Sequence, residues 1–150
     1  MATVQASVTV KATVHDAEQL WYDTSTWEGW VDGLETIVSV DGAWPAVGSG
    51  VVWESGPAGR GGVTERVVAY EQLGGQTVEV QDDSIDASQS VTFTPLDAGC
   101  EVTLTLDYRI RRRSIITPVI DALFVRNAWA SSLRSTLARF AIELETGGPG

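Results

Sequence analysis

The sequence has 150 residues, of which 43% are hydrophobic and 20% charged, and its formal net charge at pH 7 is −10. This length and apolar content indicate one folded domain with a single core and exclude a disordered chain. The acidic excess argues against general binding to nucleic acid, whose phosphates repel an acidic surface. The single cysteine excludes a disulfide framework and a cysteine-based metal site.

Membrane, secretion and cofactor signals are missing from the sequence. No apolar run approaches the roughly 18 residues that a membrane span requires, and the N-terminus lacks the basic and apolar segments of a signal peptide. We therefore predict a cytoplasmic protein. The glycine-rich turn at 56–62 lacks the Lys-Ser/Thr pair of a phosphate-binding loop, and Asp82 and Asp83 lack the spacing of a calcium loop. We predict neither a metal nor a cofactor.

Alternation of apolar and polar residues predicts seven β-strands, each half buried. The predicted ranges are 4–14, 34–41, 51–55, 62–71, 76–81, 89–94 and 101–111. Short connections favour an antiparallel sheet, and one-sided alternation predicts one covered face. Two short helical segments, at 17–22 and 27–31, follow the first strand, and His15 and Asp16 are placed to cap the first segment.

The longest predicted element is an amphipathic helix over 117–145, with one stripe of residues at steps of three and four. The stripe consists of Ile116, Ile120, Leu123, Asn127, Ala130, Leu133, Leu137, Phe140 and Leu144. Pro118 is a favourable first helical residue, and Gly147 is a favourable stop. Only this helix is long enough to cover the sheet. We therefore predict a single α+β domain over 1–146 and a flexible tail at 147–150.

Two features of this helix bear on function. Asn127 is the only polar residue of the stripe, and a buried amide needs partners from protein, water or a ligand. The segment 115–125 is apolar nearly all round. Deeper burial, a mobile gate over a cavity and a dimer face each explain this pattern, so a homodimer is one expectation.

Five segments carry a resemblance to a known fold: a strand-to-helix opening, a second short helix with its Trp, a glycine turn into a strand, the strand after it, and an arginine-rich approach to the last helix. They lie at 14–23, 27–31, 47–53, 61–71 and 111–145. The order of elements resembles the helix-grip fold of the START and birch-pollen-allergen superfamily (SRPBCC), and most of all its bacterial polyketide cyclase/dehydrase-like branch. The resemblance implies a curved seven-stranded antiparallel sheet wrapped around the C-terminal helix, with two short helices after the first strand.

The resemblance also implies a cavity between sheet and helix that holds hydrophobic or aromatic molecules such as lipids, sterols or polyketides. Members of the superfamily include carriers, sensors, cyclases, dehydratases and partner-binding subunits, so the fold does not decide the function. We expect a domain that binds a hydrophobic or aromatic small molecule. The alternatives are an aromatic polyketide cyclase or dehydratase with a pocket carboxyl as acid or base, and a non-enzymatic partner-binding subunit.

Glu65 is the candidate catalytic residue, because a carboxyl group among apolar side chains has a raised pKa and can serve as a general acid or base. Val63, Val67 and Ala69 share its strand face, and Glu65 lies inside if that face lines the cavity. In the other register Glu65 is solvated, and the inner residues are Thr64, Arg66, Val68 and Tyr70. A β-bulge would mix the two faces.

The predicted ligand-binding residues are Trp53, Glu65, Val67, Tyr108, Leu123 and Asn127. The Trp53 side chain can stack on a ring or fill space, and the Tyr108 hydroxyl can bond to a ligand or reach water at the rim. Arginines crowd the approach to the helix, at Arg109, Arg111, Arg112 and Arg113. They form either a site for a carboxylate or phosphate or a solvated strand end.

Overall fold

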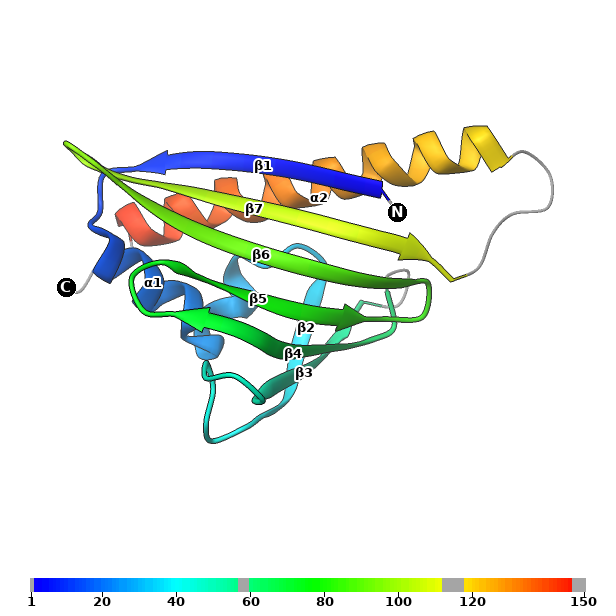
Figure 1. Ribbon diagram of the computed structural model, residues 1–150, viewed down its shortest axis with the longest axis horizontal. Coiled ribbons are helices and arrows are strands. Elements are labelled where there is room, and N and C mark those ends of the chain that lie inside the picture. The colour runs from blue at the N-terminus through cyan, green and yellow to red at the C-terminus, as the bar shows by residue number, and fades with distance from the viewer. Residues whose placement is uncertain (1, 57–59, 112–117, 147–150) are drawn as a thin grey trace.

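The computed structural model describes residues 2–56, 60–111 and 118–146, with side chains of the last helix described from Leu123 onward. The elements are β1 (Ala2–Val10), α1 (Val14–Tyr22), η1 (Thr24–Gly29), β2 (Leu34–Val40), β3 (Gly50–Ser55), β4 (Gly62–Glu71), β5 (Gly75–Gln81), β6 (Ile85–Leu96), β7 (Gly99–Ile110) and α2 (Pro118–Thr146). The strands form one seven-stranded sheet in the order β1-β7-β6-β5-β4-β3-β2, and all pairs are antiparallel (Figure 1). This α+β helix-grip architecture confirms the predicted fold.

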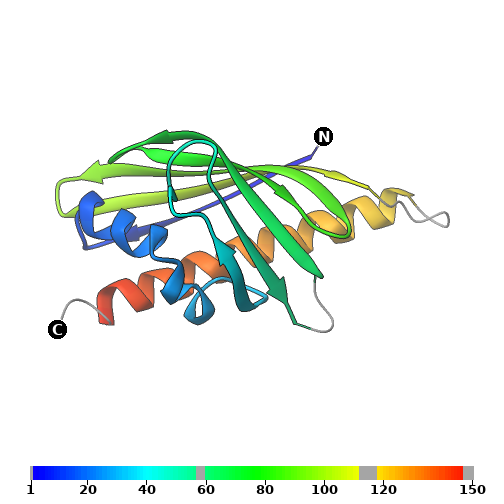
Figure 2. The ribbon, with the colours of Figure 1, turned by 90° about the horizontal axis from the view of Figure 1, so that it is seen from below.

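All three helical elements lie on the same side of the curved sheet, and α2 runs along it (Figures 1 and 2). Strand alternation supplies the apolar surface beneath them. On β7, Val102, Leu104, Leu106 and Tyr108 are buried, whereas Arg109 is exposed. The chain therefore places one apolar sheet face against the helices and leaves the other face to solvent.

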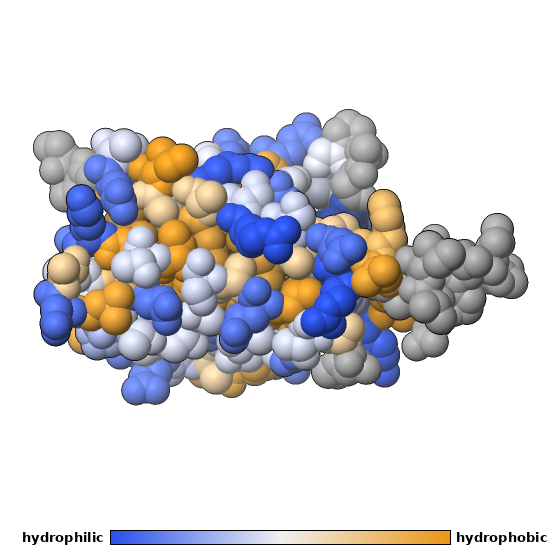
Figure 3. Space-filling view, turned by 90° about the horizontal axis from the view of Figure 1, so that it is seen from above, coloured by the Kyte–Doolittle hydropathy of each residue, from blue (hydrophilic) through white to orange (hydrophobic). Residues whose placement is uncertain are grey.

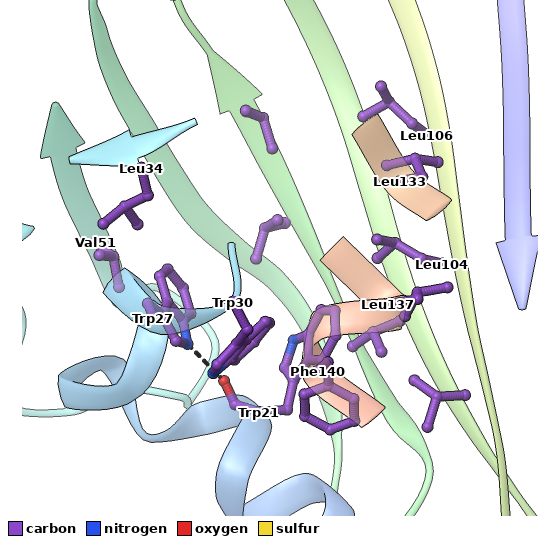
Figure 4. Close-up of a cluster of buried hydrophobic side chains, with 14 of the residues drawn as sticks. Trp21, Trp27, Trp30, Leu34, Val51, Leu104, Leu106, Leu133, Leu137 and Phe140 are labelled. Atoms are coloured by element: carbon purple, nitrogen blue, oxygen red, sulfur yellow. Dashed lines mark hydrogen bonds between the residues drawn. The ribbon is translucent and has the colours of Figure 1, made fainter. Parts of the chain in front are cut away.

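An aromatic cluster joins α1 and η1 to α2 (Figure 4). The Trp21 ring lies 4.9 Å from the Trp30 ring and 5.2 Å from the Phe140 ring, measured between centroids. The indole N–H of Trp27 donates to the backbone oxygen of Trp21 at 2.8 Å. Buried indole donors need such partners. The three tryptophans of this region are thus core residues.

Several predicted boundaries differ from the structure, and the first helix begins at Val14 and not at 17. The first strand ends at Val10, because Thr13 is the N-cap of α1 and its hydroxyl accepts from the Asp16 N–H at 3.2 Å. His15 is exposed and does not cap the helix. The second helical segment is the 3₁₀ helix η1, which begins earlier than predicted because the Asp23 carboxylate caps it through the Ser25 N–H. Strand β6 extends beyond 89–94 in both directions.

The side chains described in the first half of α2 are not more deeply buried than those in its second half. Leu123 is 59% exposed, Phe124 is 73% exposed, and Asn127 is also exposed. Figure 3 shows apolar side chains at this end of the helix. The expectation that Asn127 is a buried amide is therefore wrong, as is deeper burial for Leu123 and Phe124. The buried side chains described on α2 all lie in its second half: Leu133, Thr136, Leu137 and Phe140. The predicted tail at 147–150 lies outside the described residues.

The second half of α2 is fastened to the loop between η1 and β2 by Asp32. The Asp32 carboxylate accepts from the Ser132 hydroxyl and from Arg139 Nη2, each at 2.7 Å. Its backbone N–H donates to the Thr136 hydroxyl at 3.0 Å. These contacts fix the face of α2 that meets the aromatic cluster.

We expect Asp32→Ala to lower the free energy of unfolding by about 1 kcal/mol, because it removes two hydrogen bonds to a partly solvated carboxylate but leaves the backbone contact. Urea unfolding measures the loss. The control is Asp97→Ala, which removes an exposed carboxylate from the β6–β7 turn. Equal midpoints for the two variants would mean that Asp32 does not fasten the helix.

Candidate functional site

A cavity of about 40 Å³ lies between the concave side of the sheet and α2. Five of the six tryptophans of the chain contribute to its wall. The lining residues are Trp21, Trp27, Trp30, Val31, Asp32, Trp53, Arg60, Glu65, Gln89, Leu104, Trp129, Ser132, Leu133 and Thr136. A wall of aromatic rings with a few polar groups is the usual surface of a small-molecule site.

Glu65 is the carboxyl group that the sheet contributes to this cavity, and its neighbours on the sheet are apolar. Across the sheet it pairs with Val51 on β3 and Val80 on β5. The side chain is 7% exposed, and its Oε2 accepts from the indole N–H of Trp53 at 2.9 Å. Burial raises the pKa of Glu65, and the Trp53 hydrogen bond and the Arg60 charge offset this only in part. Glu65 therefore keeps its proton to a higher pH than an ordinary carboxyl group does, and in this form it can donate a hydrogen bond or a proton.

The burial pattern of strand β4 shows which of its two faces turns toward the helices. Val63, Glu65 and Val67 are buried, as the first of the two registers predicted. The pairing with β5 then shifts between Val67 and Ala69. Beyond this bulge Ala69 is exposed, and Tyr70 becomes half-buried. The strand thus has Glu65 inside and also contains the bulge that mixes its faces.

Arg60 closes one side of the cavity. Its guanidinium carbon lies 4.5 Å from the centroid of the Trp129 ring and 5.2 Å from that of the Trp53 ring. Its Nε donates to Asp82 Oδ2 at 2.6 Å. Burial by itself would raise the pKa of Asp82, but the hydrogen bond from Arg60, those from Ser84 and Ile85, and the Arg60 charge hold it below the usual value. Asp82 is therefore an ionised anchor for Arg60.

The structure brings together only some of the predicted ligand-binding residues. Trp53 and Glu65 line the cavity. Val67 and Tyr108 are buried on the inner sheet face, outside the lining. Leu123 and Asn127 are exposed on α2 and also lie outside the lining. A role in ligand binding stays a prediction for each of them.

Sequence reasoning missed several lining residues. Arg60 stands in a glycine-rich turn whose pattern carries no signal for a site. Gln89 is a polar residue on the inner face of β6, where it pairs with Val78 and Leu106. Trp129 lies next to the predicted helix stripe, one position before Ala130. The helix face that meets the cavity is rotated from that stripe, and a large aromatic beside the stripe was the available clue.

The arginine-rich approach to α2 behaves as a solvated strand end where it is described. Arg109 and Arg111 are exposed and lie 3.6 and 3.9 Å from the Asp86 carboxylate. Arg112 and Arg113 lie outside the described residues. Within the described ranges, no group of three His, Cys, Asp or Glu side chains is placed to hold a metal ion.

The family model described as polyketide cyclase/dehydrase and lipid transport matches residues 1–145. The chain belongs to this family. The polyketide cyclase/dehydrase resemblance deduced from the sequence is thereby confirmed. No curated protein matches the sequence significantly. In the part of this family member that the structure describes, no helix is long and apolar enough to cross a bilayer.

Solved structures share the fold of this polyketide cyclase/dehydrase family member at low sequence identity. A protein of Thermus thermophilus has a TM-score of 0.79 at 16% identity, covering 99% of this chain and 100% of its own. The di-domain ARO/CYC StfQ from the steffimycin biosynthetic pathway has a TM-score of 0.78 at 13% identity, covering 95% of this chain and 50% of its own. Norcoclaurine synthase from Thalictrum flavum, in complex with dopamine and hydroxybenzaldehyde, has a TM-score of 0.70 at 10% identity, covering 99% of this chain and 88% of its own.

Proposed function

We propose that this domain binds a small hydrophobic or aromatic molecule in the cavity between the sheet and α2. The observation that carries the proposal is the cavity wall, in which five indoles surround the buried carboxyl group of Glu65, whose pKa is raised by burial. Indole faces supply the apolar contacts, and Glu65 with Gln89 supplies the polar groups that orient a ligand. Membership of a polyketide cyclase/dehydrase and lipid transport family supports the same ligand class.

The size of the cavity sets a condition on this function. A volume of about 40 Å³ has room for a few water molecules but not for a ring system. Binding therefore requires the walls to part. Trp129 is the half-buried tryptophan of the wall, and Arg60, whose guanidinium lies against its ring, is half-buried too, so these two side chains can move at low cost.

Binding is tested with a neutral aromatic dye, N-phenyl-1-naphthylamine, whose emission rises in apolar sites. Ser132 lines the cavity and Ser131 beside it is exposed, so Ser132→Trp fills the site and Ser131→Trp is the matched control. We expect Ser132→Trp to weaken dye binding by about tenfold or more, equivalent to about 1.4 kcal/mol, and Ser131→Trp to leave it unchanged. Equal dye affinity in both variants would place the dye elsewhere. Native mass spectrometry of the purified protein identifies any molecule that travels with it.

A cyclase or dehydratase is the second candidate, and the raised pKa of Glu65 favours it. Such an enzyme needs an acid or base beside the reacting carbon, with its pKa brought toward neutrality by an apolar site. The fold similarity to StfQ is consistent with this role. We expect Glu65→Gln to abolish turnover of an identified substrate while the substrate still binds. Unchanged turnover would remove Glu65 from the chemistry.

A homodimer and a cytoplasmic location stay predictions. The exposed Leu123 and Phe124 side chains at the start of α2 support a partner-binding face. Size-exclusion chromatography with light scattering measures the oligomeric state directly.

A further inference from the structure

Arg60 lies against two of the indole rings that line the cavity. Its planar guanidinium lies against the Trp53 ring of β3 and the Trp129 ring of α2. These two indoles come from the sheet and from the helix, so the arginine bridges the two layers that must separate to enlarge the cavity. Its side chain is 22% exposed and thus reaches solvent from the mouth of the cavity.

The Arg60 side chain is held in place by the carboxylate of Asp82. The Asp82 side chain is fully buried, and its Oδ2 accepts from Arg60 Nε at 2.6 Å. Its Oδ1 accepts from the Ser84 and Ile85 backbone N–H groups at 2.8 and 2.9 Å. Asp82 is therefore rigidly held by its own turn, and it holds the guanidinium in one place between the rings.

A second cation lies beside this anchor. Arg111 Nη1 donates to the backbone oxygen of Asp82 at 2.9 Å, and the Arg111 side chain is half exposed. When Arg60 leaves, Arg111 can approach the Asp82 carboxylate and limit the cost of a buried unpaired charge. Outward rotation of Arg60 is thus compatible with the fold.

We propose that the Arg60 side chain is a built-in plug, which holds the cavity closed in the free protein and swings out when a ligand ring takes its place between Trp53 and Trp129. This inference rests on the proposed function, because the ligand is what displaces the plug. It explains why the aromatic wall encloses so little free volume. Binding then depends on the fraction of molecules in which Arg60 has left, and that fraction lowers the apparent affinity.

The test removes the plug and uses two measurements, one of which needs no ligand. The first is the rate at which the Trp53 indole N–H proton exchanges with solvent, followed by NMR. This N–H donates a hydrogen bond to Glu65 inside the cavity. The second is the affinity for N-phenyl-1-naphthylamine. In Arg60→Ala we expect the exchange rate and the dye affinity each to rise by about tenfold. This is the change for a site that is open in roughly one wild-type molecule in ten and always open in the variant. Arg66→Ala, which removes an exposed arginine from the neighbouring strand β4, is the control and leaves both unchanged.

Two further variants sharpen the test. Arg60→Lys keeps the charge but loses the planar group, so its exchange rate falls between those of the wild type and Arg60→Ala. If Arg60→Ala fails to fold because Asp82 is left unpaired, the double variant Arg60→Ala with Asp82→Asn removes that charge. The exchange rate and the dye affinity are then measured on the double variant.

The outcomes separate the plug from the function. Faster exchange with tighter dye binding supports both. Faster exchange without dye binding in any variant supports the plug and counts against the proposed function. Dye binding by the wild type, with neither quantity changed in Arg60→Ala, overturns the plug and leaves the function standing. Loss of dye binding in Arg60→Ala also overturns it, because Arg60 would then be a ligand contact.

Discussion

Phe140→Ala should lower the free energy of unfolding by about 3–5 kcal/mol, the cost typical of emptying a buried aromatic position. Phe140 is 0% exposed, and its ring lies 5.0 Å from the Trp30 ring and 5.2 Å from the Trp21 ring. Both contacts have edge-to-face geometry, which adds to the apolar transfer energy. The variant leaves a void where η1, α1 and α2 meet, and the rigid indoles around it cannot collapse to fill it. Urea unfolding monitored by circular dichroism measures the loss.

The same helix offers a matched control. Phe124→Ala deletes an identical side chain that is 73% exposed, so we expect a change within about 0.5 kcal/mol. The difference between the two variants isolates burial from helix propensity, because both changes put Ala into α2. A comparable loss in Phe124→Ala would show that the first half of α2 is covered in solution, by a second copy of the chain or another partner.

The fold was predictable because each element carries its own periodic signal. Alternation on β7 places Val102, Leu104, Leu106 and Tyr108 on one face, and the structure buries all four. The long helix follows from spacing that buries Leu133, Leu137 and Phe140. Such patterns depend on local geometry alone, with a period of two in strands and 3.6 in helices. They indicate which face of each element is covered, and the sheet order follows from short antiparallel connections.

The site was less predictable because its residues come from different elements and depend on tertiary detail. Glu65 required the register of β4, and the bulge after Val67 limits that register to the first half of the strand. Arg60 enters the cavity only because Asp82, on another turn, holds it there. Trp129 required the rotation of α2 about its axis, which sheet curvature sets. No spacing along the chain encodes these three relations.

The burial of Glu65 should make stability fall as pH rises above the usual range of a carboxyl group. In the folded protein its pKa is raised above 4.5, chiefly because burial disfavours the charged form. Between the unfolded and folded pKa values, the unfolded chain has lost this proton while the folded protein still holds it. Each pH unit in that window therefore costs about 1.4 kcal/mol, whereas the full stability is present below the unfolded pKa.

Glu65→Gln removes this titration while keeping an oxygen that can accept from the Trp53 indole. We expect the variant to gain stability relative to the wild type as pH rises above the unfolded pKa of Glu65, because only the wild type then loses stability through this carboxyl group. Urea unfolding across that range measures the difference. Glu79→Gln, on the exposed face of β5, is the control and should show a flat difference. Asp82 is present in all three proteins, so its lowered pKa cancels from the comparison. A flat difference for Glu65→Gln would mean that water or an open cavity solvates Glu65, and the protonated carboxyl on which an acid–base role depends would be lost with it.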